Sequence, residues 1–235
     1  MLLNGILLSL LAGLCIPLGA FLARIKFFRE NWKRDELRRG IIGFGAGALI
    51  SAIAFVLIPE GADKQPVWSV LLSFAAGGLV FMAIDMALAR SKSKISNFLA
   101  MMMDFVPEAI VLGAMLTQNL EQAIFLAVII AAQNVPEGYA AFTEMEKGAK
   151  SPAKLLGLFT LVGLSGPLYI LLGTTVFVQW DLALGIMMSF CAGGILYLVF
   201  EDIAPRIAMK KHWLPPFGVV FGFMLGMAGY LYLHQ

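Results

Sequence analysis

Two neighbouring apolar segments in the middle of the chain decide how it folds. They read NFLAMMMDFVPEAIVLGAML at 97–116 and LEQAIFLAVIIAAQNVPEGYAAFT at 120–143. As helices, at about 1.5 Å per residue, both are long enough to cross a hydrocarbon layer of about 30 Å. Both also carry carboxylates far from their ends, which is costly for a helix surrounded by lipid. The two segments therefore predict membrane-spanning helices that turn a polar face toward each other.

The remainder of the chain is equally apolar. Of its 235 residues, 60% are hydrophobic and only 14% are charged, and the mean hydropathy is +0.86. Soluble domains carry about 25% charged residues, so this composition excludes that class. We predict an all-α polytopic membrane protein with one transmembrane domain over 1–235 and no soluble catalytic domain. Its eight predicted transmembrane helices cover 2–23, 41–59, 66–89, 97–116, 120–143, 155–178, 182–203 and 214–234.

The distribution of positive charge predicts the orientation. Of the 17 Lys and Arg residues, 16 lie in the first, third, fifth and seventh connections, and the even-numbered connections hold only Lys64. Basic residues remain on the cytoplasmic side of short loops. We therefore expect a multi-pass protein of the plasma membrane with both termini outside the cell.

A weak internal repeat accompanies this topology. Ala46-Gly47 matches Ala192-Gly193, and Ile58-Pro59 falls on Ala204-Pro205 at the same spacing of 146 positions. The two spans concerned run in opposite directions, which predicts an inverted repeat of spans 1–3 and 6–8 around spans 4 and 5. Similarity between two glycine-rich spans can also arise from composition alone.

The deep polar residues follow one pattern in spans 4 and 5. Asp104 and Glu108 flank Pro107, and Gln133 and Glu137 flank Pro136, so each pair stands at i and i+4 on one helix face. Neither span contains Lys, Arg or His. Both sites would lie about 10 Å from the cytoplasmic edge. Because oxygen donors suit divalent cations, the pattern predicts a cation site.

Other interpretations of the same carboxylates remain open. They could be protonated and packed passively, or they could relay protons without a metal. An intramembrane aspartyl protease would need a second aspartate on a neighbouring span, for which Asp85 is the only plausible partner of Asp104. The chain contains no Gly-x-Gly-Asp sequence, which disfavours that enzyme.

At these residues the chain resembles the ZIP family of divalent metal transporters. The resemblance covers nearly the whole chain and includes Leu-Ile-Pro-Glu-Gly at 57–61 and Glu-Asp-Ile-Ala-Pro at 201–205. It implies metal uptake through a binuclear centre on spans 4, 5 and 6. It also implies that spans 1, 4, 5 and 6 move as a block against spans 2, 3, 7 and 8.

The departures from the family pattern are uneven. Asp104 stands where the family has His, Phe105 where it has Asn, and Gly166 where a Glu commonly precedes the proline. Asn134 replaces a commoner Asp or His. Because of these departures we expect a mononuclear site instead of the family's binuclear centre, and the candidate metal ligands are Asp104, Glu108, Gln133, Glu137 and Asn134.

The expected function is transport of divalent cations toward the cytoplasm by alternating access. Zn²⁺ is expected by family likeness, and a site rich in oxygen donors should tolerate Mn²⁺, Fe²⁺ or Cd²⁺. The metal is cargo, so we expect no cofactor, no enzymatic activity and no nucleic acid partner. The expected partners are the metal and the lipid bilayer, and the sequence leaves homodimerisation open. A proton-conducting protein or a metal-binding relative without transport are the alternatives. Further acidic candidates lie at the entrance and the exit, namely Glu60, Asp63, Asp85, Glu201 and Asp202.

Overall fold

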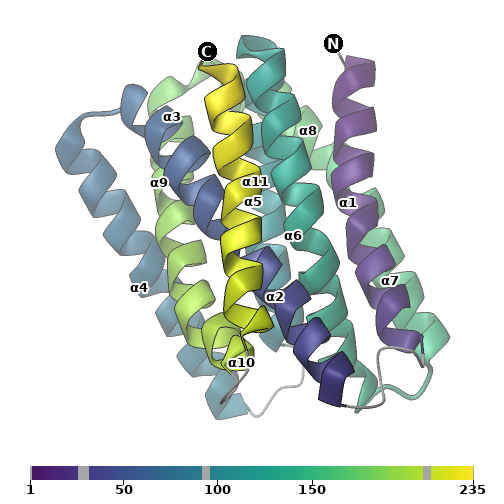
Figure 1. Ribbon diagram of the computed structural model, residues 1–235. Coiled ribbons are helices and arrows are strands. Elements are labelled where there is room, and N and C mark those ends of the chain that lie inside the picture. The colour runs from purple at the N-terminus through teal and green to yellow at the C-terminus, as the bar shows by residue number, and fades with distance from the viewer. Residues whose placement is uncertain (1, 26–31, 92–95, 209–212, 235) are drawn as a thin grey trace.

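The computed structural model describes residues 2–25, 32–91, 96–208 and 213–234 (Figure 1). In these ranges the chain forms helices joined by short turns, with no strand. Much of the basic charge expected in the connections falls on 26–31, 92–95 and 209–212, which lie outside the described residues. The all-α prediction is confirmed for the part of the chain that the structure describes.

The helices run between two ends of one bundle. We call the end where α1 begins and α11 finishes the upper end, and the opposite one the lower end, as they stand in Figure 1. The long helices are α1 (Leu2–Arg24), α2 (Trp32–Ala52), α4 (Val67–Ser91), α5 (Ser96–Gln118), α6 (Leu120–Glu146), α9 (Asp181–Leu198) and α11 (Leu214–Leu233). The shorter ones are α3 (Ile58–Asp63), α7 (Pro152–Leu164), α8 (Gly166–Thr175) and α10 (Ala204–Ile207).

Seven helical segments among the described residues are long and apolar enough to cross a membrane. Helix α5 is not one of these seven, but its 23 residues would span about 35 Å. It carries Asp104 and Glu108 and packs against α6, α8 and α9. An all-helical membrane protein is therefore the architecture that the structure supports.

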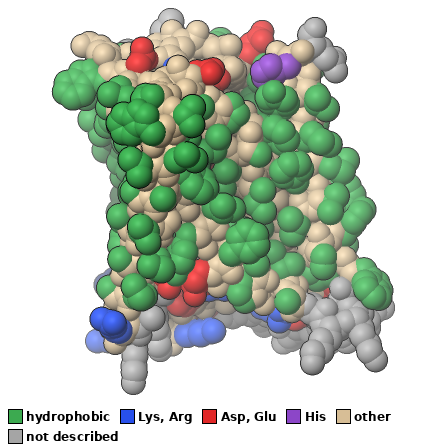
Figure 2. Space-filling model, turned by 90° about the vertical axis from the view of Figure 1, so that its left-hand side faces the viewer, with side chains coloured by type: hydrophobic (Ala, Val, Ile, Leu, Met, Phe, Trp, Pro, Cys, Tyr) green, Lys and Arg blue, Asp and Glu red, His purple; other side chains and the backbone are tan. Residues whose placement is uncertain are grey.

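The outer surface of the bundle fits a lipid environment. Figure 2 shows a broad hydrophobic band on one face, with charged side chains gathered toward its upper and lower ends. Large apolar side chains such as Leu71, Leu161 and Phe217 are half or more exposed on the outside of the bundle. Such extended apolar surface is unfavourable in water and favourable against acyl chains.

The helices form two groups, each held together by close backbone contacts at glycine. A Cβ atom added to Gly13 would lie 2.2 Å from the carbonyl oxygen of Gly163, which joins α1 to α7. Helices α1, α5, α6, α7 and α8 are connected in this way, and we call them block A. A Cβ atom added to Gly47 would lie 2.0 Å from the carbonyl oxygen of Val219, so this contact joins α2 to α11. Block B comprises α2, α3, α4, α9 and α11: glycine contacts join α2 to α11 and join α3 and α4 to α9, and α2 continues into α3 through the turn at Ile53–Leu57.

Contacts between the two blocks are of another kind. An added Cβ on Gly45 would meet the ring of Pro136, and one on Gly229 would meet the ring of Phe125. At several described glycines an added Cβ atom would lie within 3 Å of the backbone of another helix. In every such case the two helices belong to the same block. The blocks are thus closely packed inside and meet each other through side chains.

Two π-helical turns mark matching places in α2–α3 and α9–α10. They span Ile53–Leu57 and Val199–Ile203, which are 146 positions apart, and each is followed by a proline at the second residue beyond it. The N–H of Ile58 bonds to the oxygen of Ile53, and that of Ala204 bonds to Val199. Because proline has no N–H and crowds the carbonyl four residues earlier, the preceding turn widens.

The helix predicted at 155–178 is interrupted. Helix α7 ends at Leu164 and α8 begins at Gly166, with Pro167 in its first turn. Ser165 closes the break, because its N–H and its hydroxyl both bond to the oxygen of Val162, the hydroxyl at 2.6 Å. The proline explains the break, since a helix interior does not accommodate it without loss of a hydrogen bond.

Candidate functional site

Helices α5 and α6 bring their deep polar residues together. Gln133 is fully buried and its Nε2 donates a hydrogen bond of 2.6 Å to Oε2 of Glu108, which is 1% exposed. Asp104, one turn below Glu108 on α5, is 4% exposed. The charges of Asp104 and Glu108 both act on Glu137 of α6. The i, i+4 spacing in each helix therefore places three carboxylates and one amide in the same polar region.

Several oxygens in this region have no hydrogen-bond donor among the described residues. They are Oδ1 of Asp104, Oε1 of Glu108, Oε1 of Gln133 and both carboxylate oxygens of Glu137, all shielded from solvent. A buried carboxylate without a partner is very unfavourable, and nearby like charges add to the cost. A cation or bound protons would remove that cost.

The structure sets a limit on this centre. Within the described ranges, no three His, Cys, Asp or Glu side chains come close enough to hold a metal ion together. Glu108 and Gln133 are joined by a hydrogen bond, while Asp104 and Glu137 line a neighbouring cleft. Mutual repulsion disfavours a closer approach of the carboxylates by themselves.

The cleft leads from these carboxylates toward the lower end. Its volume is about 40 Å³, which suffices for about three water molecules. Asp104 and Glu137 line its deep end, as do Leu49 of α2 and Leu198 of α9. Asp202 and Arg206 lie at its lower rim, joined by an ion pair of 2.6 Å. The cleft thus runs along the boundary between blocks A and B.

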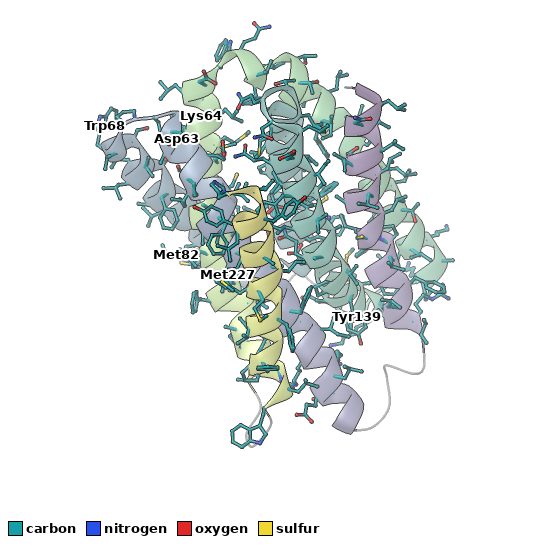
Figure 3. The ribbon with its side chains drawn as sticks, turned by 45° about the horizontal axis from the view of Figure 1, so that its top comes forward. Asp63, Lys64, Trp68, Met82, Tyr139 and Met227 are labelled. Carbon is teal, nitrogen blue, oxygen red and sulfur yellow. The ribbon has the colours of Figure 1, made fainter. Side chains whose placement is uncertain are left out.

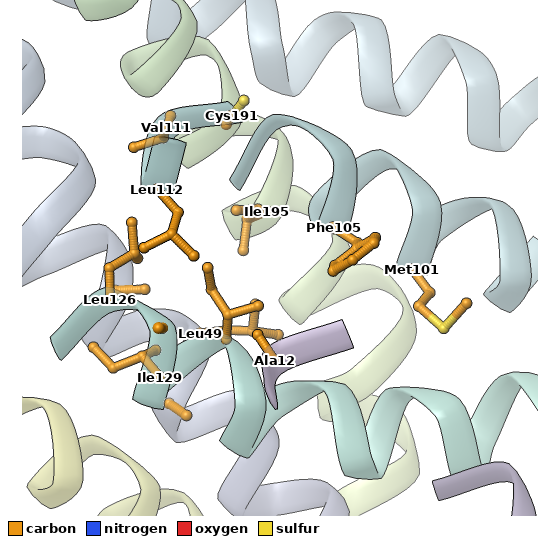
Figure 4. Packing of buried hydrophobic residues seen from close by; sticks show 14 of the residues in the cluster. Ala12, Leu49, Met101, Phe105, Val111, Leu112, Leu126, Ile129, Cys191 and Ile195 are labelled. Carbon is orange, nitrogen blue, oxygen red and sulfur yellow. The ribbon is translucent and has the colours of Figure 1, made fainter. Parts of the chain in front are cut away.

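The path toward the upper end is closed by hydrocarbon. Figure 4 shows buried side chains of α2, α5 and α6 that pack together, and each is at most 1% exposed: Leu49, Leu112, Leu126 and Ile129. Leu112 lies one turn above Glu108 on α5, and Leu126 and Ile129 lie above Gln133 on α6. Above this layer lies a separate pocket of about 160 Å³, lined by Glu60, Asp63, Gln122 and His234 among others. The apolar layer keeps this pocket apart from the carboxylates.

A polar contact also joins the blocks at the upper end. The Nζ atom of Lys64, which follows α3, donates a hydrogen bond of 2.9 Å to Oε1 of Gln118 at the end of α5. Figure 3 shows Lys64 beside Asp63 at this end of the bundle. The contact is exposed, so it contributes little stability, but it closes the upper side of the block boundary.

Asn134, the fifth candidate ligand, turns toward α1. Its Nδ2 donates a hydrogen bond of 2.8 Å to the carbonyl oxygen of Ala12, and it does not line the cleft. On the neighbouring face of α5, the buried ring of Phe105 packs edge-on against Tyr169 at 6.1 Å. The Phe105 ring would also lie 3.5 Å from a Cβ atom added to Gly166. Apolar side chains therefore occupy the region around Phe105 and Gly166, where the ligands of a second metal ion would lie in the binuclear centre that the resemblance implies.

The structure places the three acidic candidates for the exit, Asp85, Glu201 and Asp202, in different environments. Asp202 lines the cleft, whereas Asp85 accepts a hydrogen bond of 3.2 Å from the hydroxyl of Tyr197 and Glu201 is exposed. Arg206 was missed by the sequence analysis. Its position four residues after Asp202 was a usable signal, because such pairs lie on one helix face.

The chain matches no model of a protein family, and a comparison with curated protein sequences finds no match either.

Proposed function

We propose that this protein carries divalent metal cations, Zn²⁺ first among them, across the plasma membrane toward the cytoplasm by alternating access. The supporting observation is the set of buried carboxylate oxygens on Asp104, Glu108 and Glu137 that have no hydrogen-bond donor in the described part of the chain, with Asp104 and Glu137 lining the cleft. A doubly charged cargo is the guest that such a centre would stabilise. Asp104, Glu108, Gln133 and Glu137 are its proposed ligands.

The proposed topology has eight spans with both termini outside the cell. The helix α5, between α4 and α6, is the additional span. The lower end becomes the cytoplasmic side, since the described basic residues Arg38, Arg39, Lys147 and Arg206 line a cavity there. In this orientation the cleft is open to the cytoplasm and closed to the outside.

An inverted repeat underlies this topology in our proposal. Under exchange of spans 1–3 with 6–8, the pairing of α2 with α11 corresponds to that of α9 with α4. The pairing of α1 with α6 likewise corresponds to that of α8 with α5. The two π-helical turns lie at the same spacing as the sequence matches.

Blocks A and B are the proposed moving parts. Block A carries the metal ligands, and its helices α1, α5, α6, α7 and α8 are the spans that the resemblance implies to move together. Backbone contacts at glycine hold each block rigid, while side chains at the boundary can exchange neighbours. In the outward-open state the contact between Lys64 and Gln118 would be broken.

Uptake into sealed proteoliposomes tests the proposed function. We expect a trapped zinc indicator to report uptake that depends on the protein and on a metal gradient. The second candidate, a proton pathway, rests on the same carboxylates, and a trapped pH indicator separates the two. Acidification in the absence of any metal, without metal uptake, would contradict the carrier and support the proton pathway.

The number of bound ions is a separate prediction. Because Phe105 fills the space beside Gly166 and Asn134 bonds to α1, we expect one ion per protomer in the membrane. Isothermal titration of purified protein with Zn²⁺ should therefore give a stoichiometry near one. Two ions bound with comparable affinity would contradict a mononuclear centre.

Replacing Asp104 should change the preference between metals. Asp104→His adds an imidazole nitrogen at the deep end of the cleft, and imidazole favours Zn²⁺ over Mn²⁺ more than a carboxylate does. We expect the ratio of Zn²⁺ to Mn²⁺ uptake to rise about tenfold, which corresponds to about 1.4 kcal/mol. An unchanged ratio in a competition uptake assay would show that this position is not a ligand.

A further inference from the structure

A second cavity at the lower end adjoins the mouth of the cleft. Its volume is about 340 Å³, and it lies between the first turns of α2 and the last turns of α6. Tyr139, on the lower half of α6, is one of its lining residues (Figure 3). The polar and charged side chains that matter here are Arg38, Arg39, Thr143, Glu144, Lys147 and Arg206. Arg206 lines both this cavity and the cleft.

Cationic side chains predominate around this cavity. Four of the lining residues are Lys or Arg, against the single carboxylate of Glu144. Asp35 bonds to both Arg38 and Arg39, and Asp202 bonds to Arg206, so part of the positive charge is balanced from outside the cavity. Nε of Arg38 is nevertheless buried with no acceptor among the described residues. The cavity therefore retains donors and positive charge for an anion.

The arginines of this cavity are also held in place. Nη1 of Arg39 donates to the carbonyl oxygens of Arg206, at 2.6 Å, and Ala208, at 3.3 Å. These bonds fasten the end of α10 to α2 and fix the backbone that presents the Arg206 side chain. A fixed fork of guanidinium donors suits the oxygens of a phosphate group.

The position of the cavity indicates where that phosphate comes from. The cavity lies at the lower end of a bundle whose outer surface is apolar. Trp213, at the start of α11 at the same end, is 81% exposed, and tryptophan favours the level of the lipid headgroups. A basic cavity at this level is complementary to the phosphate of a lipid headgroup.

We propose that the basic cavity binds the phosphate of an anionic phospholipid. Basic pockets between membrane helices on the cytoplasmic side are suited to such headgroups. The bound anion also reduces the repulsion that Arg39 and Arg206 exert on a cation leaving the cleft. The binding itself does not depend on metal transport.

Native mass spectrometry of the full chain in neutral detergent tests this site. We expect the protein to retain phosphatidylglycerol at least tenfold more tightly than zwitterionic phosphatidylcholine. Lys147→Gln should weaken phosphatidylglycerol binding about fivefold, the contribution of one basic residue near a lipid surface. Lys150→Gln is the matched control, because Lys150 is exposed like Lys147 but does not line the cavity.

The outcomes decide between this site and its alternatives. A loss limited to Lys147→Gln, with no competition from inorganic phosphate at the same concentration as the lipid, supports the proposal. An equal loss in both variants means diffuse surface attraction and overturns it. Effective competition by inorganic phosphate means a site for free anions and overturns it as well. Equal melting temperatures of the two variants verify that both are folded.

Discussion

Replacing Glu137 by Gln is expected to abolish most metal uptake, lowering the rate by at least about 100-fold. Both carboxylate oxygens of Glu137 are shielded and without donors among the described residues, and the side chain lines the cleft. Glutamine keeps the shape but removes a charge, and loss of one buried charge from such a centre costs about 3 kcal/mol or more. Initial rates of zinc uptake into proteoliposomes measure the effect.

The same substitution should make the protein more stable in the absence of metal. Glu137 experiences the charges of Asp104 and Glu108, so its neutralisation relieves repulsion in a region of low dielectric constant. Thermal unfolding in detergent with a chelator should show a higher melting temperature. Glu121→Gln is the control, because Glu121 is exposed in the first turn of α6 and should change neither property.

A lower rate of zinc uptake together with a higher melting temperature would show that the charge of Glu137 destabilises the fold and is needed for transport. Unchanged uptake with Glu137→Gln would contradict the assignment of this residue as a ligand. Loss of uptake together with lower stability would instead indicate a structural role for the carboxylate.

Large losses of stability are expected on substitution of Gly47 and Gly193, which are 146 positions apart. A Cβ at Gly47 would lie 2.0 Å from the carbonyl oxygen of Val219, and one at Gly193 would lie 1.9 Å from that of Phe74. Since the obstacles are backbone atoms, alanine can be accommodated only by moving whole helices apart. We expect each Gly→Ala variant to lose about 3 kcal/mol of unfolding free energy, the upper part of the range for overpacked cores.

Gly157 provides a matched comparison within the same fold. A Cβ at this position meets nothing within 4 Å, so Gly157→Ala should stabilise α7 by about 0.5–1 kcal/mol through helix propensity. Denaturation of the three variants in one detergent compares them directly. Similar stabilities for Gly193→Ala and Gly157→Ala would show that α4 and α9 are not closely packed.

The helical architecture could be predicted because it depends on composition along the chain. Apolar stretches such as 214–234 leave no means of satisfying the backbone in lipid except a helix, and α11 covers Leu214–Leu233. The break at Ser165 and the two π-helical turns were not predicted. Proline signals a disturbance in a helix, but the neighbouring packing decides whether the helix kinks, widens or ends.

The polar positions of the candidate site could likewise be predicted from spacing. Asp104, Glu108, Gln133 and Glu137 share helix faces by period alone, and the hydrogen bond between Glu108 and Gln133 is a contact of that kind. Helical spacing did not predict that the side chain of Asn134 points toward α1. It depends on Ala12, which lies 122 positions away and is brought close by the packing of α1 on α6.

The sequence by itself determined that this chain is a bundle of apolar helices with carboxylates buried in two of them, because hydrocarbon permits few ways to satisfy a backbone or a charge. Only the tertiary structure decided that these carboxylates open toward one end of the bundle, and that the ion pair of Asp202 and Arg206 stands at the mouth. It also divided the helices into two blocks. These properties depend on how closely helices distant in sequence approach one another, which is set by side-chain shape across the whole core.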